Sequence, residues 1–238
     1  MALLQFISAR LLKVAIPTTI HSDHLIVAEH SDVADAINAN EQHREVHEFL
    51  SSASQRSAIG YWKPGSGLFY TTIFEEYAFP GGIIIGTDSH TPNADGLGML
   101  GIGVGGSDAV DAMAGMPWEL QCPEVDGVRL TGRLQGGVSS KDLILKLAGT
   151  VSGGKGKIID FYGPGVLTLK ATPPATVCNM SAEVGSTSCI FPFTDATACY
   201  LAATDRSFVA DAARQNSNLI IVDEGSEQHK LIASTLTR

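Results

Sequence analysis

Apolar and polar positions recur along this chain with the spacings of helices and strands. The apolar residues before Pro17 recur every three or four positions, which predicts an amphipathic core helix that ends ahead of this proline. The same criterion predicts further helices over residues 31–51, 68–77, 107–114 and 141–150. A turn at 62–67, rich in glycine, separates the first two of these helices.

Short apolar runs between the helices predict strands. They cover residues 82–85, 125–134, 157–162 and 217–222. Alternating strands and helices favour an α/β fold with layered sheets and flanking helices. The prolines at 117 and 123 mark the expected domain boundary, so we predict an N-terminal domain over 1–120 and a C-terminal domain over 121–238.

The hydrophobic content and net charge of the chain limit the kinds of molecule that it is expected to bind. The 238 residues are 44% hydrophobic, which is enough to bury a core in one large or two small domains. The net charge of −9 offers no basic surface for nucleic acid or for an anionic membrane. No apolar run approaches the roughly 20 residues that span a bilayer. We therefore expect the partner to be a small molecule or a protein, and neither nucleic acid nor a membrane.

The four cysteines, at 122, 178, 189 and 199, have no C-x-x-C spacing, so neither a zinc site nor a cluster-binding pair is predicted from them. Reduced thiols of this kind favour a cytoplasmic location. A mitochondrial location is the alternative, because the apolar residues 1–20 carry Arg10 and Lys13 and no acid. Cys178 is interpreted as a small buried residue, with a reactive thiol as the alternative.

Candidate chemistry is concentrated at residues 86–93, Gly-Thr-Asp-Ser-His-Thr-Pro-Asn. A predicted strand leads into a turn that presents the acid of Asp88, the hydroxyl of Ser89 and the imidazole of His90, which is an active-site arrangement. A hydrogen-bonded scaffold in a retired site is the alternative. Ser89 is disfavoured as a triad nucleophile because the G-x-S-x-G elbow is missing.

Two other patterns are weaker. His43 and His47 are four residues apart, but the sequence between them is not that of a zinc protease, so a solvated helix face is favoured over a metal site. The glycine run over 96–106 contains a G-x-G-x-x-G pattern without a convincing acidic partner. Close backbone packing is therefore favoured over dinucleotide binding.

Several long stretches together resemble the aconitase family, the iron–sulfur hydratases that interconvert citrate and isocitrate. These stretches are residues 16–26, 62–67, 86–93, 103–120 and 178–185. The resemblance covers nearly the whole chain and corresponds to an internal part of aconitase. It implies an aconitase-like fold of layered sheets and flanking helices, truncated to about two subdomains.

The resemblance also implies roles for particular residues. Asp23 and His24 would form an acid–imidazole pair, while Asp88, Ser89 and His90 would line the substrate pocket. Asn179 and Glu183 would lie near the bound hydroxyl and water, and a helix would place these two on one face because they are four apart. The catalytic candidates are therefore Asp23, His24, Tyr70, Asp88 and His90, and the substrate-binding candidates are Ser89, Asn179 and Glu183.

Tyr70 is included because this chain departs from the family there. The resemblance implies a catalytic histidine after the Lys-Pro-Gly-Ser-Gly turn, and tyrosine offers a phenolic proton in place of the imidazole. The resemblance also ends before the three cysteines that bind the family's 4Fe–4S cluster, and before its carboxylate-binding arginines and proton-abstracting serine. No cofactor and no metal are therefore expected for this chain alone.

These departures predict an enzyme repurposed for cluster-independent acid–base chemistry: isomerisation, dehydration, decarboxylation or cyclisation of a small carboxylated or unsaturated metabolite. A truncated aconitase that needs the missing segments is one alternative, and a noncatalytic metabolite-binding protein is another. Missing domains would expose apolar faces, so a homodimer is also expected, with a compensating repacking of the C-terminal segment as the alternative.

Overall fold

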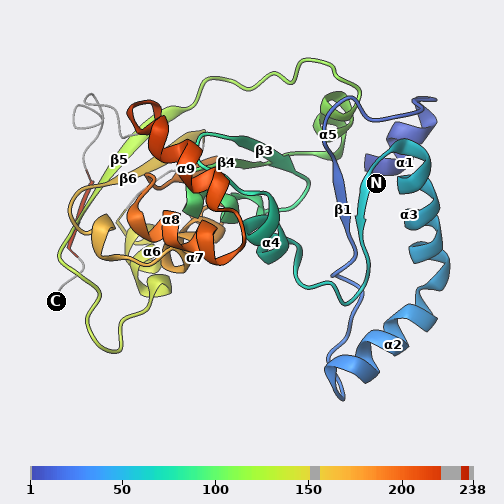
Figure 1. Ribbon diagram of the computed structural model, residues 1–238, viewed down its shortest axis with the longest axis horizontal. Helices are drawn as coiled ribbons and strands as arrows, with labels where there is room; N and C mark the ends of the chain where they lie inside the picture. The colour runs from blue at the N-terminus through green and yellow to red at the C-terminus, as the bar shows by residue number, and fades with distance from the viewer. Residues whose placement is uncertain (1, 151–155, 221–231, 236–238) are drawn as a thin grey trace. The chain divides into compact units, whose positions relative to one another are not determined.

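The computed structural model describes residues 2–150, 156–220 and 232–235, the last four by backbone only (Figure 1). The chain divides into two compact units. The first contains Met1–Thr72 and Gly105–Glu119, and the second contains Ile73–Val104 and Leu120–Arg238. Among the described residues, no helix has the length and apolarity needed to cross a membrane.

The first unit combines helices with one two-stranded parallel sheet. Its elements are α1 (Ala2–Ser8), β1 (Thr19–His21), α2 (Asp32–Gln42), α3 (Arg44–Ser57), β2 (Gly60–Trp62), α4 (Phe69–Thr72) and α5 (Gly106–Met113). Strands β1 and β2 pair so that His21 lies opposite Trp62. A small core gathers side chains from α1, α3 and α5, with Phe6 fully buried. The unit therefore places the ends of two parallel strands beside each other.

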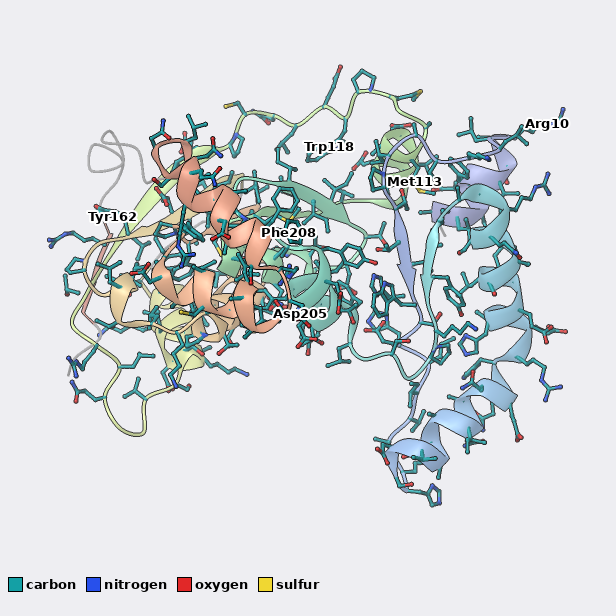
Figure 2. The ribbon with its side chains drawn as sticks, viewed as in Figure 1. Arg10, Met113, Trp118, Tyr162, Asp205 and Phe208 are labelled. Atoms are coloured by element: carbon teal, nitrogen blue, oxygen red, sulfur yellow. The ribbon has the colours of Figure 1, made fainter. Side chains whose placement is uncertain are left out.

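Two helices predicted for this unit are present, but their extents differ from the prediction. Helix α1 ends at Ser8, well before Pro17, and Arg10 (Figure 2) follows with a left-handed φ of 59° that a helix does not tolerate. The helix predicted over 31–51 is two helices, α2 and α3, which meet at His43. No glycine or proline marks that break, so the apolar spacing alone could not reveal it.

The second unit contains most of the strands. It begins with η1 (Ile73–Tyr77, a π-helix), β3 (Ile83–Gly86), η2 (Thr91–Leu97, a 3-10 helix), β4 (Leu100–Gly103), β5 (Glu124–Thr131), α6 (Ser140–Ala148) and β6 (Lys157–Tyr162). It continues with η3 (Val166–Thr168), α7 (Thr172–Asn179), β7 (Ser188–Ile190), α8 (Asp195–Ala203), α9 (Ser207–Gln215), η4 (Ser217–Leu219) and β8 (Ile232–Thr235). Strands and helices thus alternate along the chain.

The strand pairs in the described part of the second unit are all parallel. Strands β3 and β4 form one ladder, and a four-stranded sheet has the order β7-β6-β5-β8. Parallel neighbours need crossover connections, which α6 supplies between β5 and β6 and α7 supplies between β6 and β7. Apolar side chains of α6 and α7 pack on β5, β6 and β7 in the main core. The predicted α/β fold with flanking helices is confirmed.

Several predicted boundaries agree closely with the second unit. Strand β6 has the predicted limits, and the ends of β5 and α6 lie within three residues of theirs. The strand predicted over 217–222 is wrong at its start, because Ser217–Leu219 forms a turn of 3-10 helix, and residues 221–222 lie outside the described part. In the compact units, residues 73–104 pack with the C-terminal segment, whereas the predicted domains group them with residues 1–72.

The glycine run over 96–106 builds a close contact between β4 and η2. A Cβ atom on Gly101 would lie 2.6 Å from the carbonyl oxygen of Thr91, and one on Gly96 would overlap the backbone of Ala175. Neither position has room for a larger residue. The interpretation of this run as a packing feature is confirmed.

Helices α8 and α9 are joined by a tight turn in which Asp205 (Figure 2) has a φ of 56°. The next residue, Arg206, is buried and donates hydrogen bonds to the carbonyl oxygens of Ala78 at 2.7 Å and Phe74 at 2.9 Å. Its guanidinium therefore satisfies one carbonyl within η1 and one directly after it.

Candidate functional site

The first group of candidates lies at the carboxyl ends of β1 and β2. The Ser22 N–H donates to the Trp62 carbonyl at 3.1 Å, and the Ser22 hydroxyl donates to the Tyr61 hydroxyl at 3.0 Å. These bonds continue the pairing of the two strands past their last paired residues. Asp23 and His24 follow directly, at the edge of a parallel sheet where ligands commonly bind.

Asp23 and His24 differ sharply in exposure. The Asp23 side chain is 7% exposed and the His24 side chain is 69% exposed, with 3.9 Å between the Asp23 Oδ1 and His24 Nδ1 atoms. The other carboxylate oxygen of Asp23 accepts the Phe69 N–H at 2.7 Å. Asp23 thus binds the first backbone N–H of α4, where a negative charge is stabilising.

Tyr70 is the second residue of α4, so the Asp23 contact holds the turn that carries it. The Tyr70 ring is half-buried and lies edge-on to Phe69, with 5.7 Å between ring centroids. Phe69 also contacts His24, at 6.2 Å between centroids. The first unit therefore gathers Asp23, His24 and Tyr70 around one backbone segment.

His21 is a candidate that the sequence analysis missed. Its ring stacks on Trp62 at 6.1 Å, and its Nε2 lies 3.1 Å from the Thr19 hydroxyl. Burial lowers the pKa of His21, while the nearby Asp23 raises it by a smaller amount, so the environment of this imidazole favours its neutral form. The signal in the sequence that could have identified it is the order His-Ser-Asp-His at 21–24, in which a histidine lies on each side of Asp23.

The second group lies at the carboxyl end of β3. Oδ1 of Asp88 accepts the His90 N–H at 2.9 Å, and the Asp88 carbonyl accepts the Thr91 hydroxyl at 2.7 Å. These bonds form a compact turn in which Asp88 and His90 are half-buried and Ser89 is exposed. The predicted grouping of an acid, a hydroxyl and an imidazole is thus present in the folded turn.

Asn179 joins this turn from far along the chain. Its Nδ2 donates to the Oδ1 of Asn93 at 3.4 Å, and the Asn93 N–H donates to the His90 carbonyl at 3.0 Å. Asn93 is buried and was not among the predicted site residues, although it lies in the quoted motif. The second unit therefore brings Asn179 next to the segment that carries His90.

Glu183 does not share a helix face with Asn179. Helix α7 ends at Asn179, and Ser181 begins a series of turns in which its N–H donates to the Cys178 carbonyl at 2.9 Å. These short-range bonds end the helix before Glu183, which is exposed. The expectation based on four-residue spacing is wrong because it required the helix to continue.

The structure also tests the interpretations of the pair His43 and His47 and of Cys178. His47 is buried on α3, so the solvated-face interpretation is wrong for it, and its ring lies 6.3 Å from that of His43. Among the residues that the structure describes, no third ligand joins this pair. Cys178 is fully buried, and burial raises its pKa, which confirms a small buried residue rather than a reactive thiol.

Comparison with known proteins finds similarity over nearly the whole chain. The family model described as "Aconitase family (aconitate hydratase)" matches residues 7–231. The chain belongs to the aconitase family. It is 54% identical over 239 aligned positions to the mitochondrial aconitate hydratase of Emericella nidulans, covering 100% of this chain and 30% of that protein. It is 52% identical over 235 positions to the mitochondrial aconitate hydratase of Saccharomyces cerevisiae, covering 98% of this chain and 30% of that protein.

These relatives overturn the main functional prediction. Proteins 50–54% identical over essentially the whole chain are named aconitate hydratase, so the prediction of repurposed, cluster-independent chemistry is wrong. The findings favour the aconitase alternative. The chain spans about 30% of the length of these relatives. Their names also include the word mitochondrial, which favours the mitochondrial alternative over the cytoplasmic prediction.

The family uses a 4Fe–4S cluster, and the cysteines of this chain do not fit one. Iron–sulfur clusters of this type are held by several converging thiolates. Cys122 and Cys199 are exposed, whereas Cys178 and Cys189 are buried in the main core. Only that buried pair lies together in the described part of the chain. No step of the chemistry is therefore assigned to a cluster held by these residues.

Proposed function

We propose that this chain contributes acid–base and substrate-binding groups to an aconitate hydratase. The observation that carries the proposal is identity of 50–54% over nearly the whole chain to proteins with that name. The chain would act together with the regions that make up the other 70% of such proteins, in one polypeptide or in separate ones. The substrate would be a small tricarboxylate related to aconitate.

Reversible hydration of a carbon–carbon double bond needs groups that move protons at the hydroxyl and at the carbon. We assign the hydroxyl side to this chain. His90 would give the leaving hydroxyl its proton, and Asp88 would hold the turn that orients His90, through the 2.9 Å bond to its backbone. Ser89, exposed in the same turn, would bind the substrate.

Asn179 and Glu183 complete the proposed binding groups of the second unit. The bond between Asn179 and Asn93 would fix the Asn179 amide and leave its oxygen for the substrate hydroxyl. Exposed Glu183 would bind the water that enters or leaves.

In the first unit, Asp23 would position Tyr70 through its bond to the Phe69 N–H, and His24 would exchange protons with solvent. His21 lies near Asp23, and burial disfavours its protonated form. It would therefore add no positive charge that competes with the Phe69 N–H for the Asp23 carboxylate. Tyr70 would donate a phenolic proton where the resemblance implies a histidine. We further propose a mitochondrial location and a homodimer, because many large apolar side chains are exposed on each unit.

A chimera tests this proposal. The part of Saccharomyces cerevisiae aconitate hydratase that matches this chain would be replaced by the chain itself, and hydration of cis-aconitate would be measured after cluster reconstitution. We expect measurable turnover, a loss of roughly 10²-fold or more in kcat for His90→Ala, and a gain in kcat for Tyr70→His. The matched control is His30→Ala, since the His30 side chain is 73% exposed and lies in the loop before α2.

A chimera that folds, carries a cluster and does not hydrate cis-aconitate would contradict the proposal. In that case, calorimetric binding of tricarboxylates by the chain would favour the noncatalytic alternative. Equal losses for His90→Ala and His30→Ala would remove the assignment of His90 while leaving the family role intact.

A further inference from the structure

A second polar cluster is buried inside the second unit. Asp95 from η2, Cys178 from α7 and Cys189 from β7 each place one potential ligand atom within 4.8 Å of the others. Asp95 and Cys178 are 0% exposed and Cys189 is 1% exposed. Asp95 therefore meets two cysteines that lie more than 80 positions further along the chain.

The apolar surroundings of this cluster destabilise the charged form of the Asp95 carboxylate. Cys178 and Cys189 belong to the main apolar core. Asp95 accepts hydrogen bonds from the Gly101 N–H, from the Ser188 hydroxyl at 2.6 Å and from the Cys189 N–H at 3.2 Å, but no cation lies beside it among the described residues. Burial raises the pKa of Asp95 well above its ordinary value, because these bonds compensate only part of the lost hydration.

A fourth donor stands beside the cluster. The fully buried Ser181 hydroxyl neighbours the Cys189 thiol, and its oxygen makes no hydrogen bond of ordinary geometry in the described part of the chain. A buried hydroxyl with no good partner costs free energy unless something else binds it. The Ser181 hydroxyl thus adds an oxygen donor next to one of the two thiols.

The spacing suits one tetrahedral metal ion. Zinc binds thiolate sulfur at about 2.3 Å and carboxylate oxygen at about 2.0–2.2 Å, so neighbouring ligands lie about 3.3–3.8 Å apart. The three atoms in this structure lie within 4.8 Å, close enough to contract onto an ion with small side-chain movements. Two sulfur ligands favour a thiophilic ion over magnesium or calcium.

We propose that Asp95, Cys178 and Cys189, with the Ser181 hydroxyl as fourth donor, bind a single thiophilic divalent ion such as zinc. Binding would release the thiol protons and give the buried carboxylate its missing cation. The site is closed to solvent, so the ion would be taken up as the second unit folds and would serve a structural role.

An ion at this position would also affect the segments that carry Asn93 and Asn179. Asp95 lies two residues after Asn93, and Cys178 directly precedes Asn179. An ion that joins Asp95 to Cys178 would therefore fix the two segments whose side chains meet in the Asn93–Asn179 hydrogen bond. The ion would stabilise the geometry of the proposed substrate-binding groups without touching the substrate.

Metal analysis of the full chain is the direct test. The protein would be refolded with zinc, freed of loose metal by gel filtration, and measured by plasma mass spectrometry, with an expected content of about one ion per chain. X-ray absorption at the zinc edge should show two sulfur neighbours at about 2.3 Å and two oxygen neighbours at about 2.0 Å. This spectrum needs no variant, so it remains decisive even if core substitutions prevent folding.

Variants identify the ligands. The double variant Cys178→Ala, Cys189→Ala should retain less than about a tenth of the zinc, since half of the ligands are gone. The control is the double variant Cys122→Ser, Cys199→Ser, which alters the two exposed cysteines and should keep the full content.

Three results would overturn the proposal: no zinc in the refolded wild-type chain, a zinc spectrum without sulfur, or a disulfide between Cys178 and Cys189 that leaves two of the four thiols free. None of these measurements uses turnover of aconitate. The zinc site and the proposed function can therefore fail separately.

Discussion

Replacing Arg206 by methionine should destabilise the second unit more than any surface change. The guanidinium is buried and donates to the carbonyls of Phe74 and Ala78, as well as to the Thr204 hydroxyl at 3.1 Å. Methionine has a similar length and fills most of the same space. The substitution therefore tests the hydrogen bonds rather than a cavity.

The expected cost follows from those bonds. A buried acceptor left without a partner costs about 1–3 kcal/mol, and two carbonyls lose their donor. Part of this cost is recovered because the charged guanidinium no longer has to be desolvated, and desolvation is also the main reason that the pKa of Arg206 is lowered. We therefore expect a net loss of about 2–4 kcal/mol in the free energy of unfolding.

Urea unfolding followed by circular dichroism measures this loss, and thermal unfolding should show a midpoint lower by about 2–4 °C for each kcal/mol. Arg214→Met is the matched control, because Arg214 is exposed and, among the described residues, forms an ion pair only with Asp211, at 3.3 Å. That variant should change stability by less than about 0.5 kcal/mol. If Arg206→Met were as stable as Arg214→Met, the argument that these carbonyls depend on the guanidinium would be refuted.

Two further predictions concern packing and pH. Gly101→Ala should cost about 2–4 kcal/mol, because its Cβ would lie 2.6 Å from the Thr91 carbonyl, whereas Gly136→Ala has open space and should be neutral in the same urea assay. Asp35 accepts the His30 N–H, and this bond is the largest cause of its lowered pKa. A lowered pKa adds stability above the unfolded value near 4 and loses it as the pH falls through the folded value. Asp35→Asn should therefore flatten the pH dependence of the unfolding free energy below about pH 4; an unchanged slope would contradict the assignment.

Local patterns in the sequence identified much of the fold. The apolar runs of β5 and β6 and the three- and four-residue spacing of α6 depend on residues that are neighbours in the chain, so their limits could be predicted closely. Helix α8 was missed because small apolar residues surround most of its circumference and leave no polar face. The break at His43 was missed because no residue there forbids a helix.

The sequence by itself determined the family and the turn that carries Asp88, Ser89 and His90. Both can be recognised from residues that are neighbours in the chain, so no knowledge of the tertiary structure is needed. Only the tertiary structure decided that Asn179 meets Asn93 and that Asp95 meets Cys178 and Cys189. Such meetings depend on how η2, α7 and β7 pack, and no spacing along the chain encodes that packing. For the same physical reason, the separation of the cysteines in the sequence hid the buried pair that the fold brings together.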